Sequence, residues 1–250
     1  MRADWPAPDG VRAVVTTRAG GFSAPPFDSF NLAGHVGDDP GVVERNRRLL
    51  RRALNLPKDP VWLNQVHGTR VIDAASASGA EDADAAWTDR EGVVCAVMTA
   101  DCLPVFFSAL DGSSIAVAHA GWRGLAAGVL EAALAAIPAP PDQVICWLGP
   151  AIGPEAFEVG PEVRNAFVEN NSDAASAFSP GSADKWLADI YQLAAIRLRA
   201  AGVSAVHGGG FCTWSEPERF FSYRRNARTG RMASLIWKAG KTSPPRGILL

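Results

Sequence analysis

The stretch GVVCAVMTADCLPVFFSALDGSSIAVAHAGWRG, residues 92–124, contains two apolar runs that each lead into a short polar cluster. The runs Val93–Thr99 and Ser114–Ala118 are rich in β-branched and small apolar residues, which predicts two buried strands. The clusters after them bring together a carboxylate, a thiol, an imidazole and a guanidinium: Asp101, Cys102, His119 and Arg123. Functional side chains concentrate where strands give way to loops, so this stretch is the candidate active site.

The composition bounds the class of protein. The chain has 250 residues, is 48% hydrophobic and carries a formal net charge of −2, so it can bury a sizeable core and has no bulk basic field to attract nucleic acid or anionic lipid. It shows no targeting segment and no run of eighteen apolar residues. We therefore expect a cytoplasmic protein that binds neither nucleic acid nor membrane.

The four cysteines are widely spaced and form no C-x-x-C pair. This favours reduced thiols over a disulfide framework. Cys95 and Cys146 lie inside apolar runs and are expected to be buried core residues.

Periodicity and breaker residues predict a mixture of helices and strands. Strands are expected at Val11–Thr17, Pro60–Val66, Val71–Ile72, Val144–Leu148, Val203–His207, Phe220–Tyr223 and Met232–Trp237. Helices are expected at 41–56, capped by Asp38 or Asp39 and ended by Pro57, and at 124–137, 162–170 and 185–201. Residues 74–90 are predicted to be a loop. Because strands and helices do not alternate regularly and no linker divides the chain, we predict one α+β domain over residues 1–250, a layered sandwich and not a Rossmann fold or barrel.

Three of the four histidines, His35, His67 and His119, precede glycine-containing turns at strand ends or in loops. His67, Cys102 and His119 together form an N₂S donor set, and three protein ligands with an open fourth position are typical of catalytic zinc. The residues alone leave two alternatives open: a cysteine nucleophile paired with histidine, and unrelated structural roles.

Arginines supply candidate anion sites. Arg123 begins the predicted helix at 124–137, where a guanidinium and free backbone N–H groups suit phosphate; the alternative is an ion pair with Asp101 or Asp111. Five further arginines fall within residues 219–231, here called the arginine loop: Arg219, Arg224, Arg225, Arg228 and Arg231. The sequence lacks a P-loop, a dinucleotide fingerprint, a G-x-S-x-G elbow, H-E-x-x-H and the zinc-deaminase pattern.

Taken together, these motifs resemble the YfiH family, also described as laccase-domain or polyphenol-oxidase-like proteins. The matching stretches occur in the expected order along the whole chain: NLAGHVGDDP (31–40), WLNQVHGTRV (62–71), TADCLPV (99–105), AHAGWRG (118–124), LGPAIGPEAFEVG (148–160) and FFSYRRNARTGRMASLIW (220–237).

The resemblance implies a single-domain αββα sandwich with Zn²⁺ on His67, Cys102 and His119. It implies phosphorolysis of adenosine, inosine and methylthioadenosine to the free base and a ribose 1-phosphate, with adenosine deaminase activity as well. Alternatives attached to the family are amide hydrolysis of a muramyl-L-serine precursor of peptidoglycan by a cysteine-type hydrolase, and copper-dependent phenol oxidation. Four histidines are too few for a multicopper centre, so zinc is expected in preference to copper.

On this basis the catalytic residues are expected to be His35, Cys102 and His119, with His35 as general acid or base. Arg123 is expected to hold phosphate, with Arg224 or Arg225 as second choice. Asn31 is expected to bind the ribose or orient His35, and Asp101 to support its neighbour Cys102. The predicted partners are purine nucleosides and phosphate, and the sequence does not determine the oligomeric state.

Overall fold

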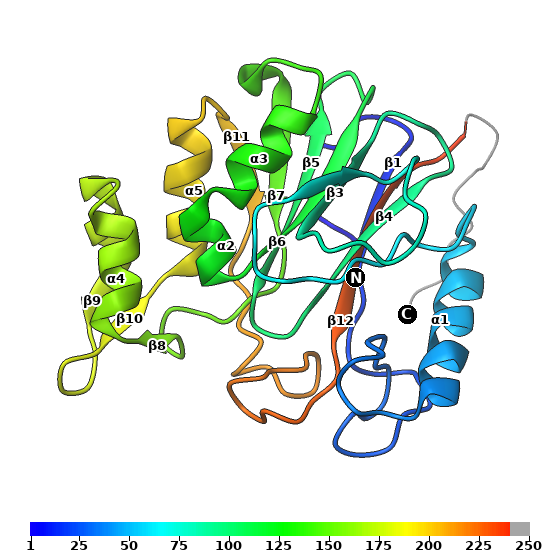
Figure 1. Ribbon diagram of the computed structural model, residues 1–250, viewed down its shortest axis with the longest axis horizontal. Coiled ribbons are helices and arrows are strands. Elements are labelled where there is room, and N and C mark those ends of the chain that lie inside the picture. Colours follow the sequence, from blue (N-terminus) through cyan, green and yellow to red (C-terminus); the bar gives the residue numbers. More distant parts are fainter. Residues whose placement is uncertain (241–250) are drawn as a thin grey trace.

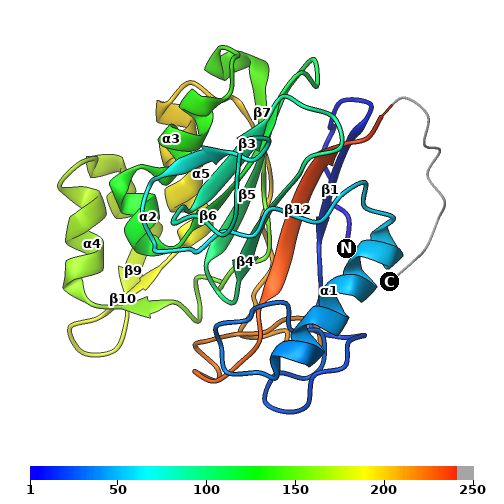
Figure 2. The same cartoon turned by 45° about the vertical axis from the view of Figure 1, so that its right-hand side comes forward.

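The computed structural model describes residues 1–240 and consists of four layers (Figures 1 and 2). Helix α1 covers the outer face of a three-stranded sheet, the inner face of that sheet packs against a six-stranded sheet, and further helices cover the far side. This confirms the predicted α+β class and αββα sandwich. The predicted domain of residues 1–250 also includes 241–250, which lie outside the described residues.

Helix α1 (Pro40–Leu54) begins where predicted, because the Asp39 carboxylate accepts the backbone N–H of Val42 at 3.0 Å. It ends earlier than predicted. Asn55 adopts a left-handed conformation with φ 48° and closes the helix, so Pro57 lies beyond its end. The apolar face of α1 packs on the three-stranded sheet through Leu50.

The three-stranded sheet has the order β1 (Val11–Val15), β12 (Met232–Lys238), β4 (Val94–Thr99), and all its pairings are antiparallel. Thr99, at the end of β4, lies opposite Met232 at the start of β12. This register joins residues 92–124 to the end of the arginine loop.

The six-stranded sheet has the order β11 (Ala205–Gly208), β7 (Val144–Leu148), β5 (Leu103–Ala109), β6 (Ile115–Ala120), β3 (Ala85–Thr88), β2 (Val71–Asp73). The pairs β11–β7 and β2–β3 are parallel and the others antiparallel. Every residue of β5 and β6 is buried, because helices cover one face and the second sheet covers the other. Burial on both faces explains why these segments read as continuous apolar runs.

The two strands predicted in residues 92–124 lie in different sheets, with β4 in the small sheet and β6 in the large one. Between them the segment Leu103–Ala109 forms β5, a strand that the sequence analysis did not predict. The chain therefore crosses from one sheet to the other at residues 100–102, which contain Asp101 and Cys102.

Helices on the far side differ from prediction in two places. The single helix expected at 124–137 is two, α2 (Trp122–Ala127) and α3 (Val129–Ala136), because Gly128 adopts φ 105° between them. The helix expected at 185–201 starts later. Residues Trp186–Ala188 form strand β10, and Asp189 then caps α5 (Ile190–Ala200) through the N–H groups of Tyr191 and Gln192.

Helix α4 (Pro161–Val168) agrees with prediction and lies beside a small sheet of order β8 (Glu158–Val159), β10, β9 (Phe178–Pro180). Short 3₁₀ helices occur at η1 (Pro141–Gln143) and η2 (Ser172–Ala177).

Three other predictions were wrong. The segment Pro60–Val66 is not a strand and pairs with its neighbours at isolated bridges. Residues 74–90 are not all loop, because they include β3. The segment Phe220–Tyr223 is irregular and forms no strand. Across residues 1–240 no helix combines the length and hydropathy needed to cross a bilayer.

Candidate functional site

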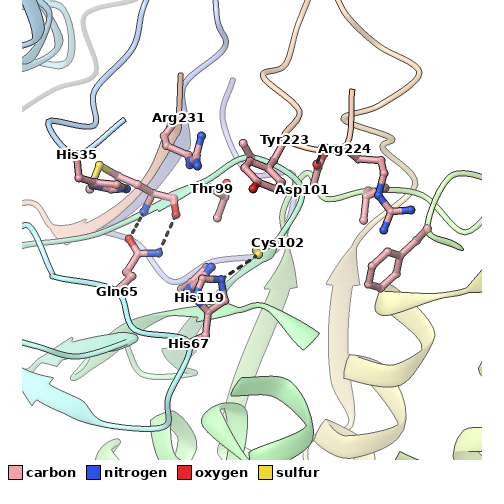
Figure 3. A pocket seen from close by; sticks show the side chains of 14 residues that line it. His35, Gln65, His67, Thr99, Asp101, Cys102, His119, Tyr223, Arg224 and Arg231 are labelled. Carbon is pink, nitrogen blue, oxygen red and sulfur yellow. Dashed lines mark hydrogen bonds between the residues drawn. The ribbon is translucent and has the colours of Figure 1, made fainter. Parts of the chain in front are cut away.

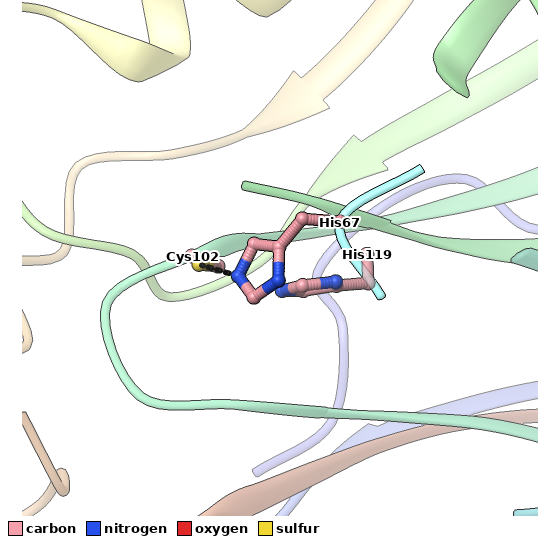
Figure 4. Close-up of side chains that lie close together, drawn as sticks. All are labelled: His67, Cys102 and His119. Carbon is pink, nitrogen blue, oxygen red and sulfur yellow. Dashed lines mark hydrogen bonds between the residues drawn. The ribbon is translucent and has the colours of Figure 1, made fainter. Parts of the chain in front are cut away.

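Three segments far apart in the sequence bring His67, Cys102 and His119 together (Figure 4). His67 lies in the loop before β2, Cys102 at the crossing from β4 to β5, and His119 near the end of β6. One potential ligand atom from each residue lies within 4.8 Å of the other two, and Cys102 Sγ is 3.9 Å from His67 Nε2. His67 is exposed, Cys102 half-buried and His119 buried, so the cluster reaches from the core to the surface.

Asp84 is the residue that organises this cluster, and its side chain is fully buried. Its carboxylate accepts backbone N–H groups from Val66 at 3.2 Å, His67 at 3.0 Å and Gly68 at 2.6 Å. It also accepts the His119 Nδ1–H at 2.8 Å, which leaves His119 Nε2 free to face the cluster. A single side chain thus fixes the loop of one candidate ligand and the ring of another.

The backbone at the site is strained. His67 has φ 59° and Asp101 has φ 88°, in a region that residues with a Cβ rarely adopt. Such conformations cost about 1–3 kcal/mol each and persist only where the surroundings enforce them. Asp84 enforces the first, and the hydrogen bonds of Asp101 described below enforce the second.

Electrostatics favour a thiolate at Cys102. Burial by itself raises the pKa of Cys102, but the His119 and His67 imidazoles outweigh it and bring the pKa to about 6. Burial lowers the pKa of His119, yet the Cys102 thiolate and Asp84 outweigh burial and raise the pKa to about 9. For Asp84, burial raises the pKa, but hydrogen bonds from His119 and the Gly68 amide hold it below the ordinary value of 3.8.

The donor set fits a metal ion. A thiolate and two imidazoles are the ligands that zinc prefers, and a carboxylate behind one imidazole is its usual support. The space is kept clear by Gly121, where a Cβ would lie 2.7 Å from His67 Cδ2 and 3.1 Å from Cys102 Sγ. That these residues bind zinc stays a prediction.

The cluster forms one wall of a cavity of about 280 Å³ (Figure 3). The other walls come from two loops before β2, from the end of β4 and the crossing to β5, from the segment after β7 and from the arginine loop. They are lined by His35, Gln65, Met98, Thr99, Ala100, Asp101, Ile152, Phe157, Tyr223, Arg224 and Arg231. Gln65 fixes the loop before His67, because its amide donates to the Met98 carbonyl at 2.8 Å and accepts the Met98 N–H at 2.7 Å.

Asp101 joins the arginine loop to the site. Its carboxylate accepts the Thr213 hydroxyl at 2.6 Å and the backbone N–H of Arg224 at 2.6 Å. Neither hydrogen bond reaches Cys102, so the support of Cys102 by Asp101 stays a prediction. The Arg224 guanidinium donates to the Glu158 carbonyl at 2.9 Å and borders the cavity.

Three predicted substrate contacts do not border this cavity. Arg123 is exposed, its guanidinium packs over the Trp122 ring at 4.5 Å, and within residues 1–240 it makes no ion pair with Asp101 or Asp111. Arg225 donates to three backbone carbonyls, those of Thr213, Trp214 and Phe220.

Asn31, the third, is fully buried, and its side chain is hydrogen-bonded to the protein. Its amide donates to Asp38 and to the Ala33 carbonyl, and its oxygen accepts the backbone N–H of Arg231 at 3.0 Å. Asn31 thus positions the arginine loop. His35, in contrast, lines the cavity. Burial, followed by the charges of Arg231 and Arg47, lowers the pKa of His35 from 6.5, so its imidazole is neutral at pH 7.

The sequence analysis missed Asp84, Thr99 and Arg231 as site residues. Asp84 directly precedes β3, and a carboxylate at the start of a strand could have marked it as a candidate. It was not considered, because the sequence analysis predicted a loop where β3 forms. Arg231 was noted only as a member of the arginine loop, and Thr99 only as the end of a strand.

The chain is similar over nearly its whole length to one protein family and to proteins named purine nucleoside phosphorylases. Residues 12–239 match the family model described as multi-copper polyphenol oxidoreductase laccase. A purine nucleoside phosphorylase of Pseudomonas aeruginosa is 58% identical over 238 residues, covering 95% of this chain and 97% of that protein. The purine nucleoside phosphorylase YfiH of Escherichia coli is 55% identical over 234 residues, covering 93% and 96%.

The fold is also similar to solved structures over nearly the whole chain. A protein of Neisseria meningitidis superposes with a TM-score of 0.93 at 51% identity, covering 96% of this chain and 99% of that one. The hypothetical protein YfiH of Bacillus licheniformis gives a TM-score of 0.84 at 29% identity, covering 91% and 92%.

Proposed function

This chain belongs to the laccase-domain family that contains the YfiH proteins, and we propose that it is a zinc-dependent purine nucleoside phosphorylase. The proposed substrates are adenosine, inosine and methylthioadenosine, each with inorganic phosphate. The products are the free purine and the ribose 1-phosphate, or its methylthio analogue. Relatives that are more than half identical over nearly the whole chain are named purine nucleoside phosphorylases.

The observation that carries the proposal is the convergence of His67, Cys102 and His119 on a cavity that arginine side chains also border. A metal at one wall and cations at another suit a substrate that is part purine nucleoside and part anion.

His67, Cys102 and His119 would hold the metal, with Asp84 orienting His119. Zinc in such a site supplies Lewis acidity and lowers the pKa of a water molecule, which is the chemistry that the proposed adenosine deaminase activity requires.

In phosphorolysis a phosphate oxygen bonds to C1′ of the ribose while the C1′–N9 bond breaks and its electron pair leaves with the purine. His35 is neutral at pH 7, so we assign it the role of accepting a proton from the bound phosphate. Arg224 borders the cavity and is the proposed contact among the arginines that the sequence analysis put forward.

The test is release of hypoxanthine from inosine by zinc-loaded protein with and without phosphate. We expect release only with phosphate, together with an equal amount of ribose 1-phosphate, and loss of release in His119→Ala. The matched control is His207→Ala, because His207 lies on β11 and does not border the cavity. No phosphate-dependent release from folded, zinc-loaded wild type would refute the proposal.

A second candidate, a metal-free cysteine hydrolase, has one specific observation in its favour. Cys102, His119 and Asp84 follow the order of nucleophile, base and orienting carboxylate, and such a site would suit the amide hydrolysis attached to the family. A hydrolase of this kind keeps its activity in a chelator and loses it to a thiol alkylator. The proposed phosphorylase loses its activity in the chelator.

A further inference from the structure

Thr99 carries a buried hydroxyl that has no hydrogen-bond partner. The residue is 1% exposed and lines the cavity, and within residues 1–240 no group lies within hydrogen-bonding reach of its Oγ1. Buried polar side chains almost always find a partner, because leaving one unsatisfied destabilises the fold. A valine would fill the same volume without that cost, so the hydroxyl calls for a partner that enters the cavity.

The sheet register brings Arg231 close to Thr99, at the end of β4. Thr99 pairs with Met232 across β4 and β12, and Arg231 directly precedes Met232. The backbone of the preceding residue, Met98, is already satisfied, because the Gln65 side chain bonds both its N–H and its carbonyl. Thr99, Arg231 and His35 therefore border the same cavity (Figure 3).

The guanidinium of Arg231 is anchored and still has donors to spare. Its Nη1 donates to the carbonyls of Thr229 and Gly230 at 2.9 and 3.1 Å, and its backbone N–H is held by Asn31. In the described part of the chain no carboxylate forms an ion pair with it. Nε and Nη2 are therefore available in a fixed planar arrangement that suits an oxyanion.

Cys102 and Asp101 lie close enough to act on the charge of Arg231, but within residues 1–240 neither forms a hydrogen bond or an ion pair with its guanidinium. Both carboxylate oxygens of Asp101 already accept hydrogen bonds, one from Thr213 and one from the Arg224 amide. His35 is neutral at this end of the cavity, as its lowered pKa indicates. Arg231 therefore keeps guanidinium donors that an anion entering the cavity can use.

We propose that Thr99 Oγ1 and the Arg231 guanidinium form the subsite for the phosphate co-substrate, with His35 bordering the bound anion. This deepens the proposed function and rests on it for the identity of the anion. It moves phosphate binding from Arg123, which lies outside the cavity, to Thr99 and Arg231, which border it. Asn31 then acts as a positioning residue for Arg231.

The test is direct binding of inorganic phosphate to zinc-loaded protein without nucleoside, by titration calorimetry. We expect Thr99→Val to weaken phosphate binding about tenfold. Arg231→Lys keeps the positive charge but loses the planar set of guanidinium donors, so it should weaken binding about tenfold to a hundredfold. The KM for phosphate in turnover should rise by the same factors while the KM for inosine changes little. Thr99→Val should also melt at the wild-type temperature or above it, which a structural role for the hydroxyl would not allow.

Two matched controls use the same kinds of side chain. Ser234→Ala removes another buried, unpartnered hydroxyl, on β12 but outside the cavity lining. Arg228→Lys changes an arginine of the same loop that packs over Phe27. Both should bind phosphate as wild type does.

A further arm titrates adenosine 5′-monophosphate, to separate free phosphate from the phosphate of a nucleotide. The proposal is overturned if wild type binds no phosphate at millimolar concentration, if Thr99→Val and Arg231→Lys bind it as tightly as the controls, or if only the nucleotide responds to the two variants. Phosphate binding that responds to both variants in a protein that does not cleave inosine would uphold the subsite and refute the phosphorylase.

Discussion

Asp84→Asn offers the most informative single change, because one buried carboxylate holds two of the three candidate ligands. The asparagine amide can accept with its one oxygen but must turn an N–H₂ group toward donors, so at least one backbone N–H among Val66, His67 and Gly68 loses its acceptor. Breaking a buried charged pair costs about 3–5 kcal/mol. We expect a loss of that size in the free energy of unfolding, and about 10- to 100-fold weaker zinc binding.

The assay is urea unfolding of the zinc-loaded and chelated proteins, with zinc affinity from competition with a chromophoric chelator. The matched control is Asp82→Asn, an exposed carboxylate two residues away that accepts only from the Asn64 side chain among groups within hydrogen-bond distance in the described chain. The stability and zinc affinity of this control should stay near wild type. If Asp84→Asn matched the control in both quantities, the assignment of Asp84 would be refuted.

The same carboxylate predicts a pH dependence. The pKa of Asp84 is lower in the folded protein than its ordinary value of 3.8, so the unfolded chain binds the proton more tightly. The stability that Asp84 contributes is complete above pH 3.8 and is lost as the pH falls below it. Acid unfolding of wild type should therefore show a drop in this range that Asp84→Asn lacks.

Three further changes test other parts of the site. Gly121→Ala should abolish zinc binding and activity, because its Cβ would lie 2.7 Å from His67 Cδ2; zinc content near one per chain would contradict this. In chelated protein, alkylation of Cys102 should rise with pH through about 6 and be blocked by added zinc; a midpoint near 9 would show that the imidazoles do not stabilise the thiolate. Arg123→Ala should leave the KM for phosphate within about twofold of wild type, since Arg123 is exposed, packs over Trp122 and does not border the cavity; a large rise would return phosphate binding to the helix start.

The sequence predicted those helices and strands whose boundaries are set by nearby residues, such as a capping aspartate or flanking turn residues. Helix α1 was found with its cap because Asp39 precedes a clear amphipathic repeat. Strands β1, β7 and β12 were found because they are short apolar runs between turn residues. The αββα layering came from the family resemblance, since no local pattern shows how two sheets stack.

The misses arose where tertiary packing overrides local preference. Alanine-rich β3 has little strand propensity, yet it pairs with β6 at the sheet interior and is mostly buried. The apolar pattern of the helix pair α2 and α3 is continuous, and only the conformation of Gly128 separates them. Trp186–Ala188 continues the helical pattern of α5 but pairs as β10.

Part of the site was visible in the sequence and part was not. His67, Cys102 and His119 were grouped as a possible N₂S donor set on their chemistry, with other roles left open, and the resemblance then implied that they bind zinc. The position of Asp84 directly before a strand was a weak signal, but the roles of Asp84 and Thr99 follow from three-dimensional contacts. The Asp84 carboxylate accepts four hydrogen bonds, and the Thr99 hydroxyl has no hydrogen-bond partner within the described chain.

The central claim is that phosphorolysis depends on a metal held by His67, Cys102 and His119. The most direct measurement removes the metal with a chelator and titrates zinc back while following both bound zinc and phosphate-dependent release of hypoxanthine from inosine. The account predicts that activity returns in proportion to bound zinc and saturates at one per chain, and that Cys102→Ala neither binds zinc nor recovers. Full activity in the metal-free protein, or zinc binding that Cys102→Ala retains, would contradict it.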